Sequence, residues 1–146
     1  VPNFTPEDQV FEIGKALKLV EGKDVTVFAT GHLVWEALLA AEELEKQGIS
    51  AEVIDIHTIK PLDTEAVLAS AAKTGAVVTA EEHLIAGGLG ELIAGVIVRN
   101  RPCPIEFVAV DDLFGQSGTP AALMKEYGLD AEHIVSAALK AVARKK

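Results

Sequence analysis

The stretch that decides the fold is Thr79-Ala80-Glu81-Glu82-His83-Leu84-Ile85-Ala86-Gly87-Gly88-Leu89-Gly90-Glu91. It follows the apolar run Ala76-Val77-Val78 and leads into a segment whose spacing predicts a helix from Glu91 to Arg99. Such strand, turn and helix junctions lie at the carboxyl end of an open parallel sheet, where sites are usually built. The charged triplet 81–83 is therefore the first place to look for function.

The segments on either side alternate between strands and helices. Continuous apolar runs predict core strands over 25–29, 51–56, 76–80 and 105–110, and an irregular edge strand is expected over 10–20. Helices are predicted over 33–47, 64–73, 120–127 and 131–144, with Asp63 and Asp130 as N-caps. The last helix is expected to turn Ile134, Ala138, Leu139 and Val142 inward. This alternation predicts an α/β domain with a mainly parallel sheet and helices on both faces.

Length and composition limit the function classes. The 146 residues are the length of one domain, which we expect over 10–146 after an extended entry segment at 1–9. A net charge of −9 argues against nucleic acid and anionic membranes as partners. The single cysteine, Cys103, permits no intrachain disulfide and suits a reducing cytoplasm. Because the chain begins with Val1, we expect a fragment or a processed product.

The triplet Glu81-Glu82-His83 permits two interpretations. A carboxylate beside an imidazole can orient it and raise its pKa, as in acid/base catalysis. However, neighbours on a strand point to opposite sides, so at most two of the three side chains can converge. The alternative, which we favour, is that one side chain caps a neighbouring helix and another forms a surface or interface ion pair.

The glycine-rich turn 87–90 resembles a phosphate-cradling loop at a helix N-terminus. It lacks the spacing of a dinucleotide fingerprint and is not a P-loop, and the glutamates around it would repel phosphate. A tight turn for close packing against a neighbouring domain is the preferred interpretation.

Other polar residues give weaker signals. His32 and His57 follow predicted strands, but no ligand spacing supports a metal site, so ordinary edge histidines are preferred. The loop with Asp111, Asp112, Gln116 and Ser117 lacks the register of a calcium loop, and Ser117 does not lie in a nucleophile elbow. The residues alone indicate an α/β domain with an acidic, glycine-rich carboxyl edge, and no reaction.

Seven short stretches occur in order along nearly the whole chain: Phe11-Glu12-Ile13-Gly14-Lys15, Gly22-Lys23-Asp24-Val25-Thr26, Ala29-Thr30-Gly31, His57-Thr58-Ile59-Lys60-Pro61-Leu62-Asp63, Glu81-Glu82-His83 with Gly87-Gly88-Leu89-Gly90, Asp112-Leu113-Phe114-Gly115-Gln116-Ser117-Gly118, and Tyr127-Gly128-Leu129. Together they resemble the C-terminal domain of transketolases, most closely the C-terminal portion of split transketolases that are encoded as two subunits.

The resemblance implies a three-layer domain with a five-stranded, mixed, mostly parallel sheet and one antiparallel edge strand. It also implies a part in two-carbon ketol transfer between sugar phosphates, in the pentose phosphate pathway, with thiamine diphosphate and a divalent cation such as Mg²⁺. In that family a GDG…N segment of the N-terminal domain binds the diphosphate and metal, and the middle domain supplies the activating glutamate. This chain has no GDG segment, so we assign it no catalytic, cofactor-binding or metal residue and expect it to be inactive alone.

The resemblance further implies partners and an interface. The partners are the N-terminal and middle transketolase domains or subunit, and a second copy in a homodimer of the complete enzyme. The residues expected to face them match two motifs of the family: Glu81, Glu82, His83, Gly87, Gly88, Gly90, Asp112, Phe114, Gly115, Ser117 and Gly118.

Three alternatives stay open. The equivalent domain of a 2-oxoacid dehydrogenase beta subunit or of a deoxyxylulose phosphate synthase has similar motifs. A regulatory or assembly module could bind an effector or partner at the Glu81 to Gly90 edge. A hydrolase that uses Ser117 or His83 is the least favoured.

Overall fold

The computed structural model describes residues 14–57, 59–84, 88–110 and 129–145. Its single sheet has the strand order β1-β3-β2-β4-β5, formed by β1 (Leu17–Val20), β2 (Val25–Ala29), β3 (Ala51–Asp55), β4 (Val77–Leu84) and β5 (Ile105–Val110). β1 pairs antiparallel with β3, and the other neighbours pair in parallel. The predicted five-stranded mixed sheet with one antiparallel edge strand is therefore confirmed.

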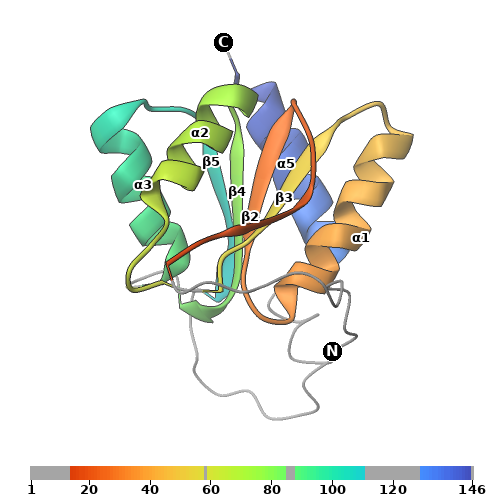
Figure 1. The fold of residues 1–146 in the computed structure, drawn as a ribbon. Coiled ribbons are helices and arrows are strands. Elements are labelled where there is room, and N and C mark those ends of the chain that lie inside the picture. The colour runs from red at the N-terminus through yellow and green to blue at the C-terminus, as the bar shows by residue number, and fades with distance from the viewer. Residues whose placement is uncertain (1–13, 58, 85–87, 111–128, 146) are drawn as a thin grey trace.

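Helices cover both faces of this sheet (Figure 1). α1 (Leu33–Lys46) and α5 (Ala131–Ala143) pack on one face, and α2 (Thr64–Thr74) and α3 (Leu89–Asn100) pack on the other. Both predicted side-chain caps are present, because Asp63 accepts a hydrogen bond from the Ala66 amide at 3.1 Å and Asp130 accepts one from the His133 amide at 2.9 Å. These carboxylates satisfy amides that a helix leaves unpaired in its first turn.

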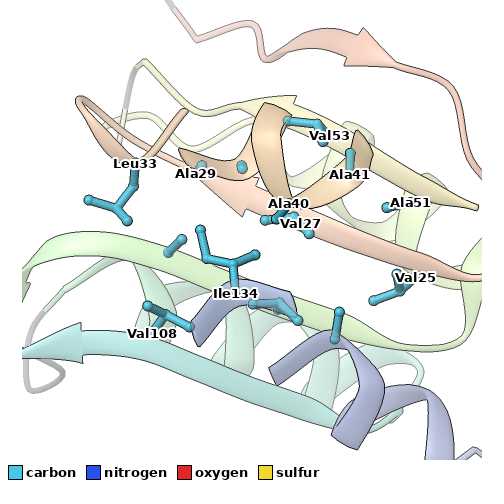
Figure 2. Close-up of a cluster of buried hydrophobic side chains, with 14 of the residues drawn as sticks. Val25, Val27, Ala29, Leu33, Ala40, Ala41, Ala51, Val53, Val108 and Ile134 are labelled. Atoms are coloured by element: carbon cyan, nitrogen blue, oxygen red, sulfur yellow. The ribbon is translucent and has the colours of Figure 1, made fainter. Parts of the chain in front are cut away.

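The core consists of two aliphatic clusters, one on each side of the sheet. Figure 2 shows the cluster under α1 and α5, where Val27, Val53 and Ile134 are fully buried. Phe28 and Ile93 are fully buried in the cluster under α2 and α3. Burying each such side chain contributes about 1.5–3 kcal/mol, so the two clusters hold both helical layers on the sheet.

Three predictions about the elements are wrong. β4 continues past residue 80 to Leu84, because its end pairs with Val110 of the next strand. β5 has the predicted bounds but lies at the edge of the sheet, where Phe107 is 39% exposed. Leu139 is 37% exposed, and Ala141 takes the inward position instead. Strand order and helix rotation depend on packing that local periodicity does not report.

Some expectations lie outside the described residues, namely the entry segment 1–9, residues 10–13 of the edge strand and the helix 120–127. Residues 14–16 were also predicted as part of the edge strand, but they are irregular and β1 begins at Leu17. Among the helices that the structure describes, none is both long enough and apolar enough to cross a membrane.

Candidate functional site

The carboxyl end of β4 carries the charged triplet singled out by the sequence, and strand alternation sends its two glutamates to opposite faces of the sheet. Glu81 is fully buried on the α3 side. Its Oε1 accepts a hydrogen bond from the Leu89 amide at 2.7 Å, and its Oε2 accepts one from the Gly90 amide at 2.6 Å. A helix N-terminus favours negative charge, and here Glu81 supplies it from within the chain.

Glu82 holds the beginning of the other helix at this edge. Its Oε1 accepts a hydrogen bond from the His32 amide at 2.9 Å, at the start of α1. Gly31 adopts a left-handed φ of 57°, and a β-carbon there would lie 3.4 Å from the same Glu82 oxygen. Glu81 and Glu82 therefore diverge and each binds a helix N-terminus, so they do not form a convergent acid/base pair.

Gly90 allows α3 to approach the sheet closely. A β-carbon at this position would lie 2.6 Å from Cδ1 of Phe107 and 2.8 Å from Oγ1 of Thr79, both closer than normal contact. Thr79 is fully buried and its hydroxyl has no hydrogen-bond partner among the described residues. The close packing expected of this glycine is thus made within the domain, and a role toward a neighbouring domain stays a prediction.

The remaining predicted site residues are placed only in part. Gly88 is the N-cap of α3, and His83 belongs to the β4 backbone. The other members of the predicted interface lie outside the described residues: Gly87, Asp112, Phe114, Gly115, Ser117 and Gly118. The interface assignment of the whole set stays a prediction.

The histidines of this edge build no metal centre with the acidic residues that the structure describes. Within these residues, no group of three or more His, Cys, Asp or Glu side chains could hold a metal ion. Asp55 lies at the end of β3 near His57, and burial raises the pKa of its carboxyl in spite of the favourable charge of His57. The described part of the edge thus provides two capped helices and separate polar side chains.

A second polar cluster, which the sequence analysis missed, lies toward the amino end of the strands. Glu52 of β3 is fully buried. Its carboxylate accepts hydrogen bonds from the Ser70 hydroxyl at 2.5 Å, the Gly22 amide at 3.2 Å and the Lys73 ammonium, and Lys18 lies 3.7 Å away. The signal in the sequence was a lone glutamate inside an apolar strand, because a buried charge needs partners.

The Ser70 and Lys73 pair has the S-x-x-K spacing of some serine hydrolases, but its environment excludes that chemistry. Ser70 is 4% exposed, and its hydroxyl donates a hydrogen bond to the Glu52 carboxylate. Hydrogen bonds to Glu21 and Glu52 hold the pKa of Lys73 well above its usual value, so the side chain stays an ammonium and is no base. Burial raises the pKa of Glu52, but the hydrogen bonds from Lys73, Ser70 and Gly22 outweigh this effect and lower it.

This cluster borders a pocket of about 350 Å³, floored by alanine side chains and Ile54. A chain of hydroxyl groups continues inward from it, because Thr26 Oγ1 lies 2.7 Å from Ser70 Oγ and 2.7 Å from Thr74 Oγ1. The buried carboxylate is therefore fully partnered, which is the condition for a stable buried charge. The cluster joins β1, β3 and α2.

The model of the family "Transketolase, C-terminal domain" matches residues 14–134. The chain is 53% identical over 139 residues to the 6-deoxy-6-sulfo-D-fructose transketolase subunit SqwH of Clostridium sp. (strain MSTE9), covering 95% of this chain and 43% of that protein. It is 37% identical over 141 residues to one of the subunits of an apulose-4-phosphate transketolase from Phocaeicola vulgatus, covering 97% of this chain and 45% of the relative. The chain thus spans less than half the length of these relatives.

Solved structures agree with the sequence relatives. A protein described as "Split gene transketolase, inactive beta4 tetramer" superposes with a TM-score of 0.96 at 47% identity, over 100% of this chain and 48% of the other. A transketolase from Leishmania mexicana shares the fold, with a TM-score of 0.67 at 20% identity over 90% of this chain and 18% of the other. With the family model covering most of its length, this chain belongs to the transketolase C-terminal domain family.

Proposed function

We propose that this chain is the C-terminal domain of a split transketolase subunit, and that it serves domain packing and assembly without a catalytic group of its own. The observation that carries the proposal is the similarity to two proteins over nearly the whole chain. One is described as a transketolase subunit and is 53% identical over 95% of the chain, and the other is described as a split gene transketolase and is 47% identical over 100% of the chain. The complete enzyme would transfer a two-carbon ketol unit between sugar phosphates, with thiamine diphosphate and Mg²⁺.

The described residues do not fit the cofactor. A diphosphate at the glycine-rich turn would need the amides at the start of α3, and Glu81 already binds those of Leu89 and Gly90. Its carboxylate, together with Glu82 at the neighbouring helix, would also repel an anion. The diphosphate and its metal therefore belong to the partner domains, and no step of ketol transfer is assigned to this chain.

The carboxyl edge is the surface that we propose for packing against those domains. Its two helix starts are held rigidly from one strand, by Glu81 on one side and Glu82 on the other. Rigid, pre-organised surfaces lose little conformational entropy on docking. The complete enzyme is proposed to assemble further through copies of this chain, as a dimer or a larger oligomer, in line with the tetramer formed by the related split transketolase.

Reconstitution tests this proposal. The chain is mixed with a second polypeptide that supplies the missing N-terminal and middle domains, together with thiamine diphosphate and Mg²⁺. Transfer is followed with ketose phosphate donors and aldose phosphate acceptors, and with 6-deoxy-6-sulfo-D-fructose and apulose 4-phosphate. We expect activity only when both polypeptides are present. A well-folded complex that lacks transfer with every donor would refute the transketolase assignment.

A charge reversal separates docking from folding in the same assay. Glu82→Lys changes the docking edge, and Glu45→Lys makes the same change at an exposed position near the other end of α1. We expect Glu82→Lys to weaken assembly at least tenfold, which corresponds to about 1.4 kcal/mol, and Glu45→Lys to leave it unchanged. Thermal unfolding of both variants measures the contribution of the lost cap. Equal assembly by the two variants would exclude this edge as the docking surface.

A further inference from the structure

The two edges of the sheet are protected differently. Natural sheets guard exposed edges with charged residues, especially lysine, with proline or with bulges. β1 has such guards, since Lys18 lies within it and its pairing with β3 contains a register irregularity between Lys18 and Val20. Across the sheet, β5 contains one charged residue in six, Glu106, and no described strand pairs with its outer side.

The charges at β5 protect only the start of its edge, where Arg144 donates a hydrogen bond to the Ile105 carbonyl at 3.3 Å. The Glu106 side chain turns to the α5 face, where it pairs with Arg144 and lies 3.9 Å from Lys140. Phe107 turns to the opposite face, where its ring lies over Gly90 of α3, and it is 39% exposed. Figure 2 shows β5, in teal, as the outermost strand of the sheet. The β5 edge is thus mostly apolar, and the charge of Glu106 is neutralised by Arg144.

The backbone of β5 also presents hydrogen-bonding groups outward. The Val77 amide donates to the Pro104 carbonyl at 2.9 Å, and Val77 lies opposite Ile105 in a parallel ladder. Backbone groups of alternate residues point to the same side, so those of Glu106 and Val108 face β4. The amides and carbonyls of Ile105, Phe107 and Ala109 consequently face away from the sheet.

The flank of α3 extends the same apolar margin. Gly90, Ala94 and Val98 are four residues apart and form one stripe on the helix, and the first of them lies under the Phe107 ring. Ala94 is half-buried and Val98 is 66% exposed. Val98 is the most exposed large hydrophobic side chain among the described residues.

We propose that the outer edge of β5 pairs antiparallel with β5 of a second copy of this chain, around a two-fold axis at Phe107. This inference rests on the assembly proposed above and names its surface. With Phe107 opposite its symmetry mate, Ile105 lies opposite Ala109, and all three outward-facing residues form hydrogen-bonded pairs. About six backbone hydrogen bonds would result, and in two of them the acceptor would be the Ile105 carbonyl, which also accepts a hydrogen bond from Arg144 at 3.3 Å. The sheet would become continuous through ten strands, twice the five of one copy.

The charges of β5 favour a second copy as the occupant. In this register Glu106 lies opposite Val108 of the mate, so that the two glutamates do not face each other directly. Each keeps its own Arg144 partner, and like charges directly opposite, which destabilise paired strands, are avoided. The overall charge of −9 per chain still opposes association at long range. Added salt screens that repulsion, so we expect the dimer to tighten as the salt concentration rises.

Sedimentation of the full chain, alone, tests the proposal in 0.5 M salt. We expect a dimer that dissociates on dilution, and we expect each of two variants to raise its dissociation constant at least tenfold. Ala109→Pro removes an outward-facing amide without touching the ladder to β4, which is where a sheet tolerates proline. Val98→Lys charges the α3 flank without loss of buried area. Leu39→Lys, at a 39% exposed leucine on the other face of the sheet, is the matched control and should leave the dissociation constant unchanged.

Hydrogen exchange provides a second readout. The amides of Ile105, Phe107 and Ala109 should gain protection as the protein concentration rises, and the exposed amides of β1 should not. A chain that stays monomeric up to about 1 mM overturns the proposal, as does a dimer that neither variant weakens. Protection of these amides only when the complementary polypeptide is added would also overturn it, in favour of a partner strand. None of these results bears on reconstituted activity, so the two proposals fail separately.

Discussion

Replacing Glu81 by glutamine should destabilise the domain far more than the same change at Glu82. Both carboxylates accept amide hydrogen bonds at a helix start, but Glu81 is fully buried and accepts two, at 2.7 and 2.6 Å. Glu82 accepts one, at 2.9 Å, in a more exposed setting. Glutamine keeps the shape of Glu81 and turns one oxygen into a donor that faces another donor.

The magnitude follows from the contacts. A hydrogen bond to a charged group contributes about 1.5–3 kcal/mol, and an unpaired buried donor costs about 1–3 kcal/mol. Loss of the charge at the helix N-terminus adds about 0.3–1 kcal/mol. We expect Glu81→Gln to lower the free energy of unfolding by about 3–7 kcal/mol, which is about 6–28 °C in melting temperature for a domain near this size. Glu82→Gln should cost about 1 kcal/mol.

Urea unfolding followed by far-ultraviolet circular dichroism measures both variants against the parent chain. The comparison is valid if the slopes with denaturant are equal, because a change in slope signals a change in the unfolded ensemble or a loss of two-state behaviour. A Glu81→Gln variant within about 1 kcal/mol of the parent would refute the assignment of Glu81 as the internal anion of α3. Equal losses in the two variants would show that burial does not separate their roles.

Four other substitutions test the packing and the buried charges. Gly90→Ala should destabilise the chain by about 1–3 kcal/mol, because the new β-carbon would lie 2.6 Å from the Phe107 ring. Gly95→Ala, in the same helix, meets only a flexible side chain at 3.7 Å and should stabilise the chain by about 0.5–1 kcal/mol. Thermal melts in which both variants shift the melting temperature in the same direction would contradict this prediction. The pKa of Glu52 is lower in the folded chain than its ordinary value of 4.5. The contribution of ionised Glu52 to the free energy of unfolding is therefore complete above pH 4.5 and is lost as the pH falls through the folded pKa. The difference in this free energy between the parent and Glu52→Gln should shrink over that range, and a constant difference would exclude the linkage. Burial raises the pKa of Asp55 above its ordinary 3.8, so its ionised form opposes folding. Asp55→Asn should therefore stabilise the chain at pH 7 and lose this advantage as the pH falls through the raised folded pKa toward 3.8. Urea titrations at pH 7 and below pH 3.8 test this, and an advantage that persists at the lower pH would contradict it.

Many elements of the fold could be predicted because their signals are local. β2 and β5 have the predicted bounds, and α2 and α5 begin at the predicted capping aspartates. A cap bonds amides only a few residues away, and a buried parallel strand is apolar throughout. The antiparallel edge strand followed from the family resemblance and was likewise confirmed.

The candidate site was predicted only as a location. The sequence placed Glu81 and Glu82 at a sheet edge and limited their convergence through strand alternation, with a helix cap as the preferred role for one of them. Both turned out to bind helix starts, and Glu82 does so across 50 residues of sequence. Which helix lies on which face of the sheet depends on the crossover connections, and a single sequence does not show how those connections run.

Contacts between distant segments account for what the sequence left undecided. Glu52 is buried because Gly22, which precedes β2, and the α2 residues Ser70 and Lys73 meet around its carboxylate. Similarly, β5 has the composition of a central strand, and only the strand order places it at an edge. Local propensity and capping act within a few residues and can be read from the chain. The partners of a buried charge and the neighbours of a strand exist only once the layers have packed.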